Sequence, residues 1–314
     1  MGTVQFWRGL GGAMKRWLVV VALGITAICS YSQTPTAVRP RILGIDHVSF
    51  YTTQPEGVKA LYSSTLGLAS AEPVEADGLV RYIVGRQWVG YSPAFESKWN
   101  NRMDHVAFTT DNIAALRRYL IGKGVKVPAV EGRADHSLSF MVADPEGHRI
   151  EFVERGKGAQ LAAPSDSAVS RHMIHAGFLV HNRDAEDHFY RELLGFRPYW
   201  HGGVDPDETD WISIQVPDGT DWLEYMVNQP EHLDARRMGV LNHISLGVAD
   251  MKQAQVILEA HGWKPHGDEK AQMGKDGKWQ LNMYDPDLTR IELMEFKPVE
   301  KPCCSDFTGP HPSE

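Results

Sequence analysis

The chain has 314 residues, of which 42% are apolar and 23% charged, and a formal net charge of -8. A chain of this length can hold two domains that each bury a core, and its acidic balance provides no broad basic surface for nucleic acid or anionic lipid. We therefore expect a soluble globular protein that binds a small molecule and no nucleic acid.

Residues 1–32 have the pattern of a secretory signal peptide. Lys15 and Arg16 precede the apolar run WLVVVALGITAIC, which is too short to span a bilayer comfortably, and Ser30-Tyr31-Ser32 offers a small-x-small cleavage site. We predict a secreted or periplasmic protein. An uncleaved anchor is the alternative, and only then would the chain contact a membrane.

Four segments of the remaining chain open alike, with a histidine at the start of a strand pattern. They read DHVSFYT from Asp46, DHVAFTT from Asp104, IHAGFLV from Ile174 and NHISLGV from Asn242. On the histidine's face the following side chain is small, whereas the opposite face is apolar. One face is therefore expected to join a core and the other to line an open space.

After each opening strand we predict one helix and three short strands, so that the unit is repeated four times. Asp111, Asp184 and Asp250 stand where helix N-caps are expected. Glycines stand where the helices are expected to end, namely Gly67, Gly122, Gly195 and Gly262.

The predicted units group into two domains. A stretch of linker composition begins at Gly156, and such a stretch marks a domain boundary. We expect a first domain at 42–155 (units 42–97 and 102–155), a second at 171–298 (units 171–228 and 240–298) and a tail at 299–314. Pairing of the first unit with the fourth, and of the second with the third, is the alternative.

The last strand of three units carries a glutamate. Glu151, Glu224 and Glu292 follow the histidine of their unit by 46, 49 and 49 residues, whereas the first unit has Gly90 or a neighbour there and no acid. A buried carboxylate is costly unless it is hydrogen-bonded, protonated or bound to a cation. Imidazole nitrogen together with carboxylate oxygen suits a borderline divalent metal.

Two metal sites are predicted on this basis, with Zn, Ni, Mn or Fe as the candidate ions. The main site lies in the second domain, on His175, Glu224, His243 and Glu292. A second, weaker site lies in the first domain, on His47, His105 and Glu151. Ordinary core or solvated roles for all seven residues are the alternative.

With these residues in place, the chain resembles the vicinal oxygen chelate superfamily, which contains glyoxalase I, methylmalonyl-CoA epimerase, fosfomycin-resistance proteins and extradiol ring-cleaving dioxygenases. The resemblance covers residues 42–298 and is strongest in DPEGHRIEF from Asp144 and DPDLTRIEL from Asp285. It implies an α+β fold in which βαβββ units pair into two open barrels, with a metal in the cleft. Leu288 replaces the usual glycine of the second turn, which questions that turn's geometry.

Two branches of the family imply different ligand sets. The four-ligand pattern of glyoxalase I falls on His175, Glu224, His243 and Glu292. Four units in one chain are more similar to the extradiol dioxygenases. Their metal ligands, two histidines and one glutamate, fall on His175, His243 and Glu292, so Glu224 has no counterpart. The tyrosine that these dioxygenases carry is missing, because Asn282 stands about where it belongs and Tyr284 is displaced by two.

The fourth carboxylate decides the preferred chemistry. Oxygen chemistry at ferrous iron needs open neighbouring positions, whereas a carboxylate that leaves the metal can take a proton from carbon while the metal stabilises the enediolate. We predict glyoxalase- or epimerase-like lyase or isomerase chemistry on a substrate with vicinal oxygens, with Glu224 and Glu292 as catalytic candidates. An extradiol dioxygenase and a non-catalytic binding protein are the alternatives.

The tail holds two adjacent cysteines, Cys303 and Cys304, and the third cysteine, Cys29, lies in the signal segment. Such a distribution rules out a disulfide framework. Pairing of the two cysteines with each other, pairing with another chain, and a thiolate metal or redox site all stay open.

Overall fold

The computed structural model describes residues 38–71, 78–93, 101–157, 162–267 and 269–314, which belong to one compact unit from Val38 to Glu314. The predicted signal peptide, residues 1–32, lies outside the described residues. Within the described part of the chain, no helix is long and apolar enough to cross a membrane.

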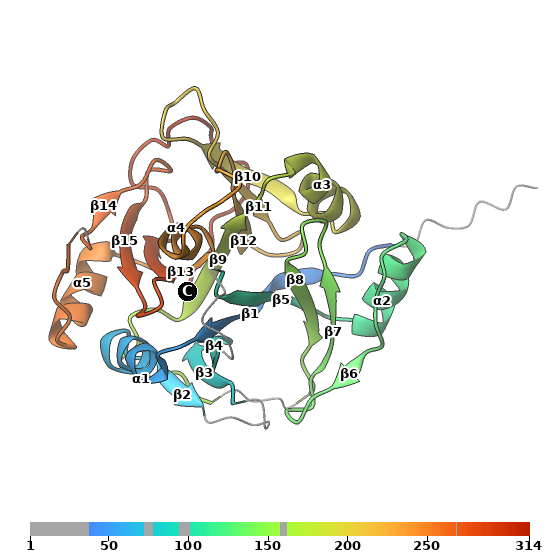
Figure 1. The fold of residues 1–314 in the computed structure, drawn as a ribbon, viewed down its shortest axis with the longest axis horizontal. Helices are drawn as coiled ribbons and strands as arrows, with labels where there is room; N and C mark the ends of the chain where they lie inside the picture. The colour runs from blue at the N-terminus through green and yellow to red at the C-terminus, as the bar shows by residue number, and fades with distance from the viewer. Residues whose placement is uncertain (1–37, 72–77, 94–100, 158–161, 268) are drawn as a thin grey trace, which may run out of the picture. The chain divides into compact units, whose positions relative to one another are not determined.

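The first half of this unit forms an eight-stranded sheet in the spatial order β2-β3-β4-β1-β5-β8-β7-β6 (Figure 1). Its strands are β1 Ile42–Thr52, β2 Ala69–Ala71, β3 Val80–Val84, β4 Gln87–Pro93, β5 Met103–Thr110, β6 Glu131–Gly132, β7 Leu138–Ala143 and β8 Arg149–Glu154. Helix α1 (Pro55–Lys59), continued by the π-helical turn η1 (Ala60–Thr65), follows β1, and α2 (Ile113–Gly122) follows β5.

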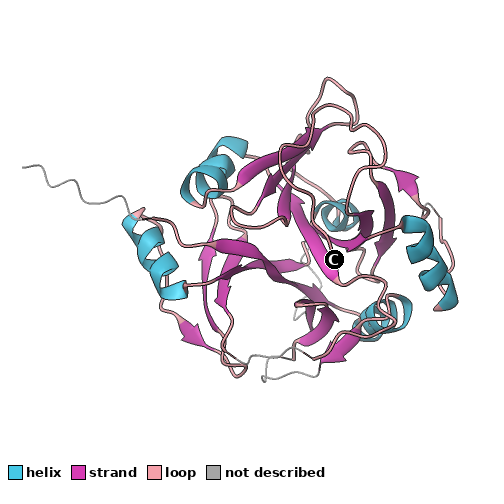
Figure 2. Cartoon of the chain, turned by 180° about the vertical axis from the view of Figure 1, so that it is seen from behind, coloured by secondary structure: helices cyan, strands magenta, loops and turns pink. Residues whose placement is uncertain are grey.

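The second half repeats this plan in the order β10-β11-β12-β9-β13-β16-β15-β14, and strands dominate both halves in Figure 2. Its strands are β9 His172–Leu179, β10 Arg197–Gly202, β11 Trp211–Gln215, β12 Trp222–Met226, β13 His243–Val248, β14 Gln272–Met273, β15 Trp279–Tyr284 and β16 Arg290–Glu295. Its helices are α3 Arg183–Asp187 with the π-helical turn η2 His188–Leu193, α4 Ala235–Leu241 and α5 Met251–Ala260.

The four predicted repeats are present, and the predicted fold class is confirmed. In each sheet the opening strands of two repeats pair antiparallel, β1 with β5 and β9 with β13. The first repeat therefore joins the second and the third joins the fourth, which excludes the alternative grouping. The expected domain limits stay a prediction, because both sheets belong to the same compact unit.

The helix ends differ in part from the sequence prediction. Asp250 caps α5 as expected, but the caps of α2 and α3 are Asn112 and Asn182, each one or two residues from the aspartate that was predicted. Asparagine and aspartate accept from helix N–H groups equally well, so composition alone does not choose between neighbours. Gly122 is the last residue of α2, and the left-handed residue beyond it is Gly124.

The turn that carries Leu288 keeps the geometry of its glycine-containing counterpart. Leu288 adopts φ 70°, close to the left-handed conformation of Gly147 at φ 91°. The N–H of Leu288 donates to the Asp285 carbonyl at 2.9 Å, and Asp285 and Thr289 bond through their backbones. The replacement of glycine therefore leaves the turn in place, at the strain cost of a non-glycine residue in this region.

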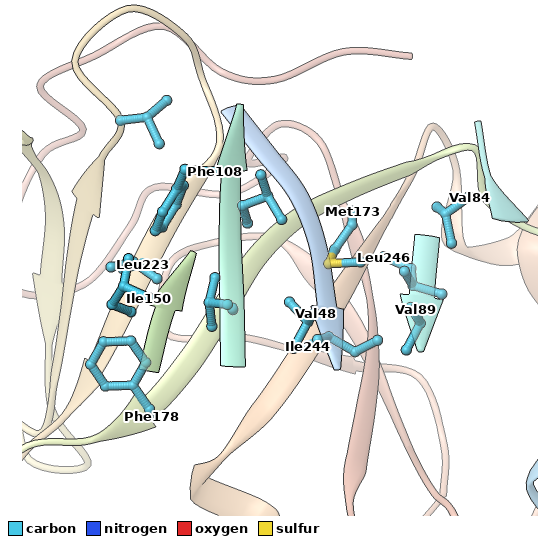
Figure 3. Packing of buried hydrophobic residues seen from close by; sticks show 14 of the residues in the cluster. Val48, Val84, Val89, Phe108, Ile150, Met173, Phe178, Leu223, Ile244 and Leu246 are labelled. Atoms are coloured by element: carbon cyan, nitrogen blue, oxygen red, sulfur yellow. The ribbon is translucent and has the colours of Figure 1, made fainter. Parts of the chain in front are cut away.

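The core is built from the side chains that alternate with the histidines. Val48, Phe108, Phe178 and Ile244 are fully buried on the apolar faces of the four opening strands. They belong to one cluster that extends over both sheets (Figure 3). The opposite faces of these strands are left to carry the histidines, as period-two alternation requires.

A buried carboxyl group links the second repeat to the third. Glu186 of α3 is fully buried, and its Oε1 accepts from the N–H of Glu146 at 3.0 Å. The nearby carboxylate of Asp144 accepts from the Tyr190 hydroxyl at 2.9 Å and from His148 Nδ1 at 2.7 Å. Burial, with the charge of Asp144, raises the pKa of Glu186 to about 9, so the group is protonated at neutral pH.

This raised pKa predicts how stability depends on pH. Between the ordinary pKa of 4.5 and the folded-state pKa of about 9, the folded protein binds more protons at Glu186 than the unfolded chain does. Its contribution to stability therefore falls as pH rises through that interval. We expect Glu186→Gln, which stays neutral, to weaken this fall and to raise the free energy of unfolding at pH 8 by about 1–3 kcal/mol.

Urea denaturation at several pH values measures the effect, with the exposed Glu192→Gln as the matched control. The prediction would be contradicted if the free energies of unfolding of the wild type and Glu186→Gln, plotted against pH, ran parallel from pH 5 to pH 9.

Candidate metal centres

The second sheet brings together all four residues of the predicted main site. Gly177 of β9 lies opposite His243 of β13, and His175 of β9 lies opposite Ser245 of β13. On the outer flanks, β12 runs parallel to β9 and places Glu224 beside Gly177, and β16 runs parallel to β13 and places Glu292 beside Ser245. We call His175, Glu224, His243 and Glu292 the second centre.

The ligand atoms of the second centre lie close to one another. His175 Nε2 is 3.1 Å from His243 Nε2 and 3.4 Å from Glu292 Oε2. Glu224 Oε2 is farther out, at 3.6 Å from His243 Nε2 and 3.9 Å from His175 Nε2. The site therefore consists of three close ligand atoms and one looser carboxylate.

These distances fit a divalent ion. Ligand bonds of about 2.0–2.2 Å, set at angles from right to tetrahedral, separate neighbouring ligand atoms by about 3.0–3.5 Å. Glu292 Oε2 is buried without a hydrogen-bond partner among the described residues. The Leu241 carbonyl accepts from His243 Nδ1 at 3.0 Å, so Nε2 of that ring carries the lone pair that a metal needs.

The guanidinium group of Arg290 already contacts the Nε2 lone pair of His243. Arg290 Nη2 donates to His243 Nε2 at 2.5 Å, and Arg290 Nη1 lies 3.9 Å from Glu292 Oε1. A metal held by His243 requires the same lone pair, so Arg290 is the side chain that has to turn aside. Arg290 recurs as Arg149 in the matching motif of the second repeat, but the sequence assigned it no role at the site.

Burial controls the protonation of the second centre. Burial, followed by the charge of Arg290, lowers the pKa of both His175 and His243, which keeps the rings neutral and able to bind a metal. Burial, followed by the charge of Glu292, raises the pKa of Glu224 to about 8. The looser carboxylate can thus hold a proton near neutral pH, as a group that moves protons must.

A cavity of about 260 Å³ opens on the second centre. Glu224, Glu292 and Asn282 line it together with aromatic side chains. Of the aromatic residues from the third repeat, Trp200, Trp211 and Trp222 line the cavity, whereas Tyr225 is part of the core. Tyr284 packs instead on Arg236, at 5.4 Å from guanidinium carbon to ring centroid.

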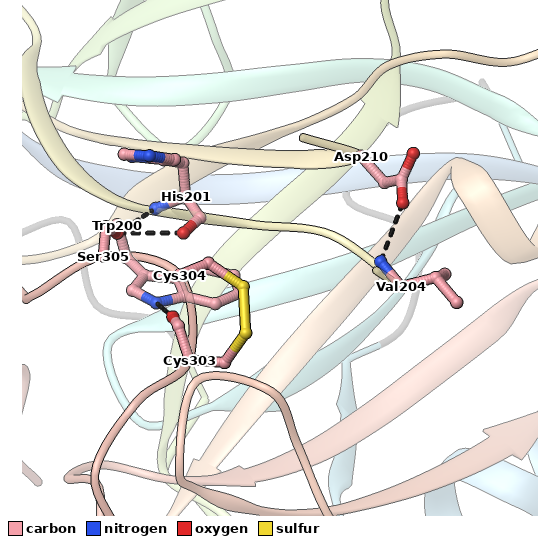
Figure 4. The surroundings of a disulfide bond; sticks show 7 residues. All are labelled: Trp200, His201, Val204, Asp210, Cys303, Cys304 and Ser305. Atoms are coloured by element: carbon pink, nitrogen blue, oxygen red, sulfur yellow. Dashed lines mark hydrogen bonds between the residues drawn. A yellow bond between two sulfur atoms is a disulfide. The ribbon is translucent and has the colours of Figure 1, made fainter. Parts of the chain in front are cut away.

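The C-terminal tail forms one wall of this cavity. A disulfide joins Cys303 to Cys304, the Cys303 carbonyl accepts from Trp200 Nε1 at 3.3 Å, and Ser305 Oγ accepts from the His201 N–H at 2.9 Å (Figure 4). Beyond the disulfide, Phe307 reaches the cavity itself. Of the pairings left open by the sequence, the two cysteines pair with each other.

Lys278 also lines the cavity and does not belong to the repeated pattern of histidines and acids. Its side chain is fully buried, and its Nζ lies 4.6 Å from the Trp222 ring, 5.0 Å from the Phe307 ring and 5.6 Å from the Tyr199 ring. Burial lowers its pKa to about 8, against the opposing charge of Asp276. A signal existed in the sequence, because Lys278, which directly precedes β15, continues the alternation of Gln280 and Asn282 with core residues of that strand.

The first sheet holds a second cluster, the first centre, made of His47, His105 and Glu151. His47 Nε2 lies 3.0 Å from His105 Nε2 and 3.2 Å from Glu151 Oε2, and His105 Nε2 lies 3.5 Å from the same oxygen. Asp46 and Asp104 each accept from the Nδ1 of the following histidine at 2.7 Å. In a neutral ring Nε2 therefore carries the lone pair, which is the tautomer that metal-binding histidines adopt. In a protonated ring Nε2 instead donates to Glu151.

Hydrogen bonds set the charges of the first centre. Burial alone would lower the pKa of His105, but its bonds to Asp104 and Glu151 outweigh burial and raise that pKa. Burial alone would raise the pKa of Glu151, whereas bonds from His105 and His47 and the charge of Arg133 hold it far below the usual range. Arg133 forms an ion pair with Glu151 Oε1.

The first centre has no space for a fourth acid, although His105 borders a separate cavity of about 350 Å³. Gly90 of β4 lies beside Ser49, as Glu224 lies beside Gly177 in the other sheet. A Cβ at Gly90 would come within 2.6 Å of the Trp88 ring, which stacks on His47 at 3.7 Å between centroids. Trp88 therefore occupies the space in which a fourth acid would lie.

Comparison with known proteins agrees with this architecture. The 2,3-dioxygenase LapB from Pseudomonas sp. KL28 is 16% identical with a TM-score of 0.63, covering 88% of this chain and 96% of that one. A Mn(II)-bound glyoxalase from Novosphingobium aromaticivorans is 18% identical with a TM-score of 0.61, covering 82% and 83%. A 2,2',3-trihydroxybiphenyl 1,2-dioxygenase from Sphingomonas wittichii is 16% identical with a TM-score of 0.61, covering 81% and 90%.

At these identities the structural matches establish the fold. No curated protein sequence matches the chain. The model of one sequence family matches twice, over residues 44–152 and 171–293, so that each match contains one of the two centres. The chain belongs to the Glyoxalase/Bleomycin resistance protein/Dioxygenase superfamily.

Proposed function

We propose that this protein is an exported, divalent-metal-dependent enzyme that moves a proton next to a carbonyl group, in the manner of a glyoxalase or an epimerase. The observation that carries the proposal is the position of Glu224. Its carboxylate lies within 4 Å of both histidines of the second centre, faces the cavity, and has a pKa raised to about 8. It is a carboxylate placed to exchange protons with a bound molecule.

In the proposed reaction, His175, His243 and Glu292 would hold the metal, which when bound would supply Lewis-acid stabilisation of negative charge on the substrate's oxygens. Glu224 takes the proton from carbon and returns it. Trp211 and Trp222 pack against the substrate's apolar part and exclude water, which strengthens the electrostatic contacts inside the cavity. Proton transfer by a positioned carboxylate contributes about 10²–10⁴-fold to the rate of such reactions.

An extradiol-type ring-cleaving dioxygenase is the second candidate. His175, His243 and Glu292 supply the three ligand atoms that lie close together. A set of two histidines and one carboxylate leaves coordination positions on iron open for oxygen. One observation argues against this candidate. Asn282 lies beside Glu292 on the cavity wall, about where the dioxygenases carry a tyrosine, and a side-chain amide cannot replace the acid-base capacity of a tyrosine hydroxyl. A non-catalytic binding protein is the third candidate.

The metal predicted for the second centre is tested by titration of the mature protein with Zn, Ni, Mn and Fe. We expect one tightly bound ion per chain, because the acid of the first centre is already paired with Arg133. His243→Ala should lose the ion, and the matched variant His105→Ala should keep it. An ion that is lost only from His105→Ala would place the metal in the first sheet and end the catalytic proposal.

The chemistry is tested by solvent deuterium exchange into 2-hydroxy carbonyl compounds, with oxygen uptake on catechols measured in parallel. We expect exchange by the metal-loaded protein, and a loss of about 10²-fold or more in Glu224→Gln. The exposed Glu231→Gln is the control and should be unaffected. Oxygen consumption that survives Glu224→Gln would assign a dioxygenase instead.

A further inference from the structure

The cavity contains a positive charge that the proposed proton transfer does not use. Lys278 is fully buried and directly precedes β15. Its Nζ lies among Trp222, Phe307, Tyr199 and Met294, all of which line the same cavity. The ammonium is therefore part of the cavity wall.

This ammonium lacks the oxygen partners that a buried charge requires. Its hydrogen-bond contact within the described residues is the weak acceptor Met294 Sδ at 3.9 Å. No carboxylate of the described chain forms an ion pair with it, since Asp276 Oδ1 instead accepts from the Lys278 backbone N–H at 3.2 Å and from the Gln280 amide at 3.3 Å. An ammonium has three donors to satisfy, and three aromatic faces offset only part of the lost hydration.

A bound anionic group would supply the missing oxygens. The charges of the cavity wall limit the charge that this group can carry. Three acidic residues, Glu224, Glu292 and Asp276, and two basic ones, Lys278 and Arg290, line the cavity. A doubly charged phosphate would face three acidic groups, whereas a carboxylate matches one ammonium and brings a single charge. The aromatic walls and a volume of about 260 Å³ suit a small molecule with an apolar body.

We propose that Lys278 binds the carboxylate of the substrate, so that the enzyme acts on small monocarboxylic acids that also carry the vicinal oxygens. This inference rests on the proposed function for the reacting part of the substrate, but the carboxylate site itself needs no metal. Lys278 is a specificity-determining residue in this scheme, because it contacts the substrate away from the reacting atoms. Phe307 of the tail forms one side of the carboxylate site.

The test uses the metal-free protein, so that a carboxylate cannot bind through the metal. Calorimetric or tryptophan-fluorescence titration compares 3-phenylpropanoate with its neutral amide, which has the same shape. We expect the wild type to prefer the acid at least about tenfold, a difference of about 1.4 kcal/mol. Lys278→Met should lose this preference, and Lys278→Arg, which keeps the charge, should retain part of it.

Lys275→Met is the matched control, because Lys275 lines the same cavity but is exposed to solvent. It should leave the preference unchanged, since exposed charges are screened. A preference that survives in Lys278→Met but is lost in Arg290→Met would overturn the proposal, and so would equal binding of acid and amide to the folded wild type. Inorganic phosphate that competes as well as the acid would overturn the assignment to carboxylates.

The metal-loaded enzyme separates this inference from the proposed function. If deuterium exchange is absent but Lys278 still decides acid over amide, the proton-transfer proposal fails and the carboxylate site stands. If exchange occurs on neutral and acidic substrates with the same KM, and Lys278→Met changes neither the exchange rate nor the KM, the carboxylate site is ruled out while the proton-transfer proposal stands.

Discussion

The close approach of β9 and β13 is the constraint on which the second centre depends. Gly177 lies opposite His243, and a Cβ at that position would come within 2.1 Å of the His243 ring. The imidazole fills the space that a side chain would need. With larger residues there, the two histidines could not bring their Nε2 atoms to 3.1 Å, and the flanking acids would have no common point to face.

The two sheets show how one repeat pattern can give centres of different character. Glu224 and Gly90 occupy equivalent places beside the opening strands. In the second sheet the acid faces a cavity, whereas in the first sheet Trp88 stacks on His47 and fills that space. The glutamates do not follow this division. Glu151 Oε1 is paired with Arg133 and Glu292 Oε1 lies near Arg290, while Oε2 of each has no hydrogen-bond partner in the described chain.

The cavity at the second centre is lined by groups that reduce stability. Lys278 and Glu224 both have pKa values displaced toward 8 by burial, so each charged form is destabilised in the folded protein. A buried charge without an ion-pair partner costs free energy in the folded protein, so these charges oppose folding. Their presence around one cavity is what a site for a charged ligand predicts.

The sequence by itself determined the repeat, the face on which each histidine lies and the register of the glutamates, because strand alternation and constant spacing are local properties of the chain. It could not identify Asn112 and Asn182 as caps, since neighbouring residues cap equally well. It also assigned no role to Lys278, Arg290 and Arg133, because none of them recurs in all four repeats; Arg290 recurs once, as Arg149 in the second. Their contacts arise only where distant strands and the C-terminal tail meet.

The sequence favoured joining the first repeat with the second and the third with the fourth, and strand pairing confirmed this grouping. Tertiary structure alone decided which centre has space for a fourth acid. That outcome depends on strand pairing and on the bulk of side chains far apart in sequence, such as Trp88 against His47 and Phe307 beside Lys278. Local spacing specifies which side chains share a face, but the volume left between faces is set by what packs from elsewhere in the chain.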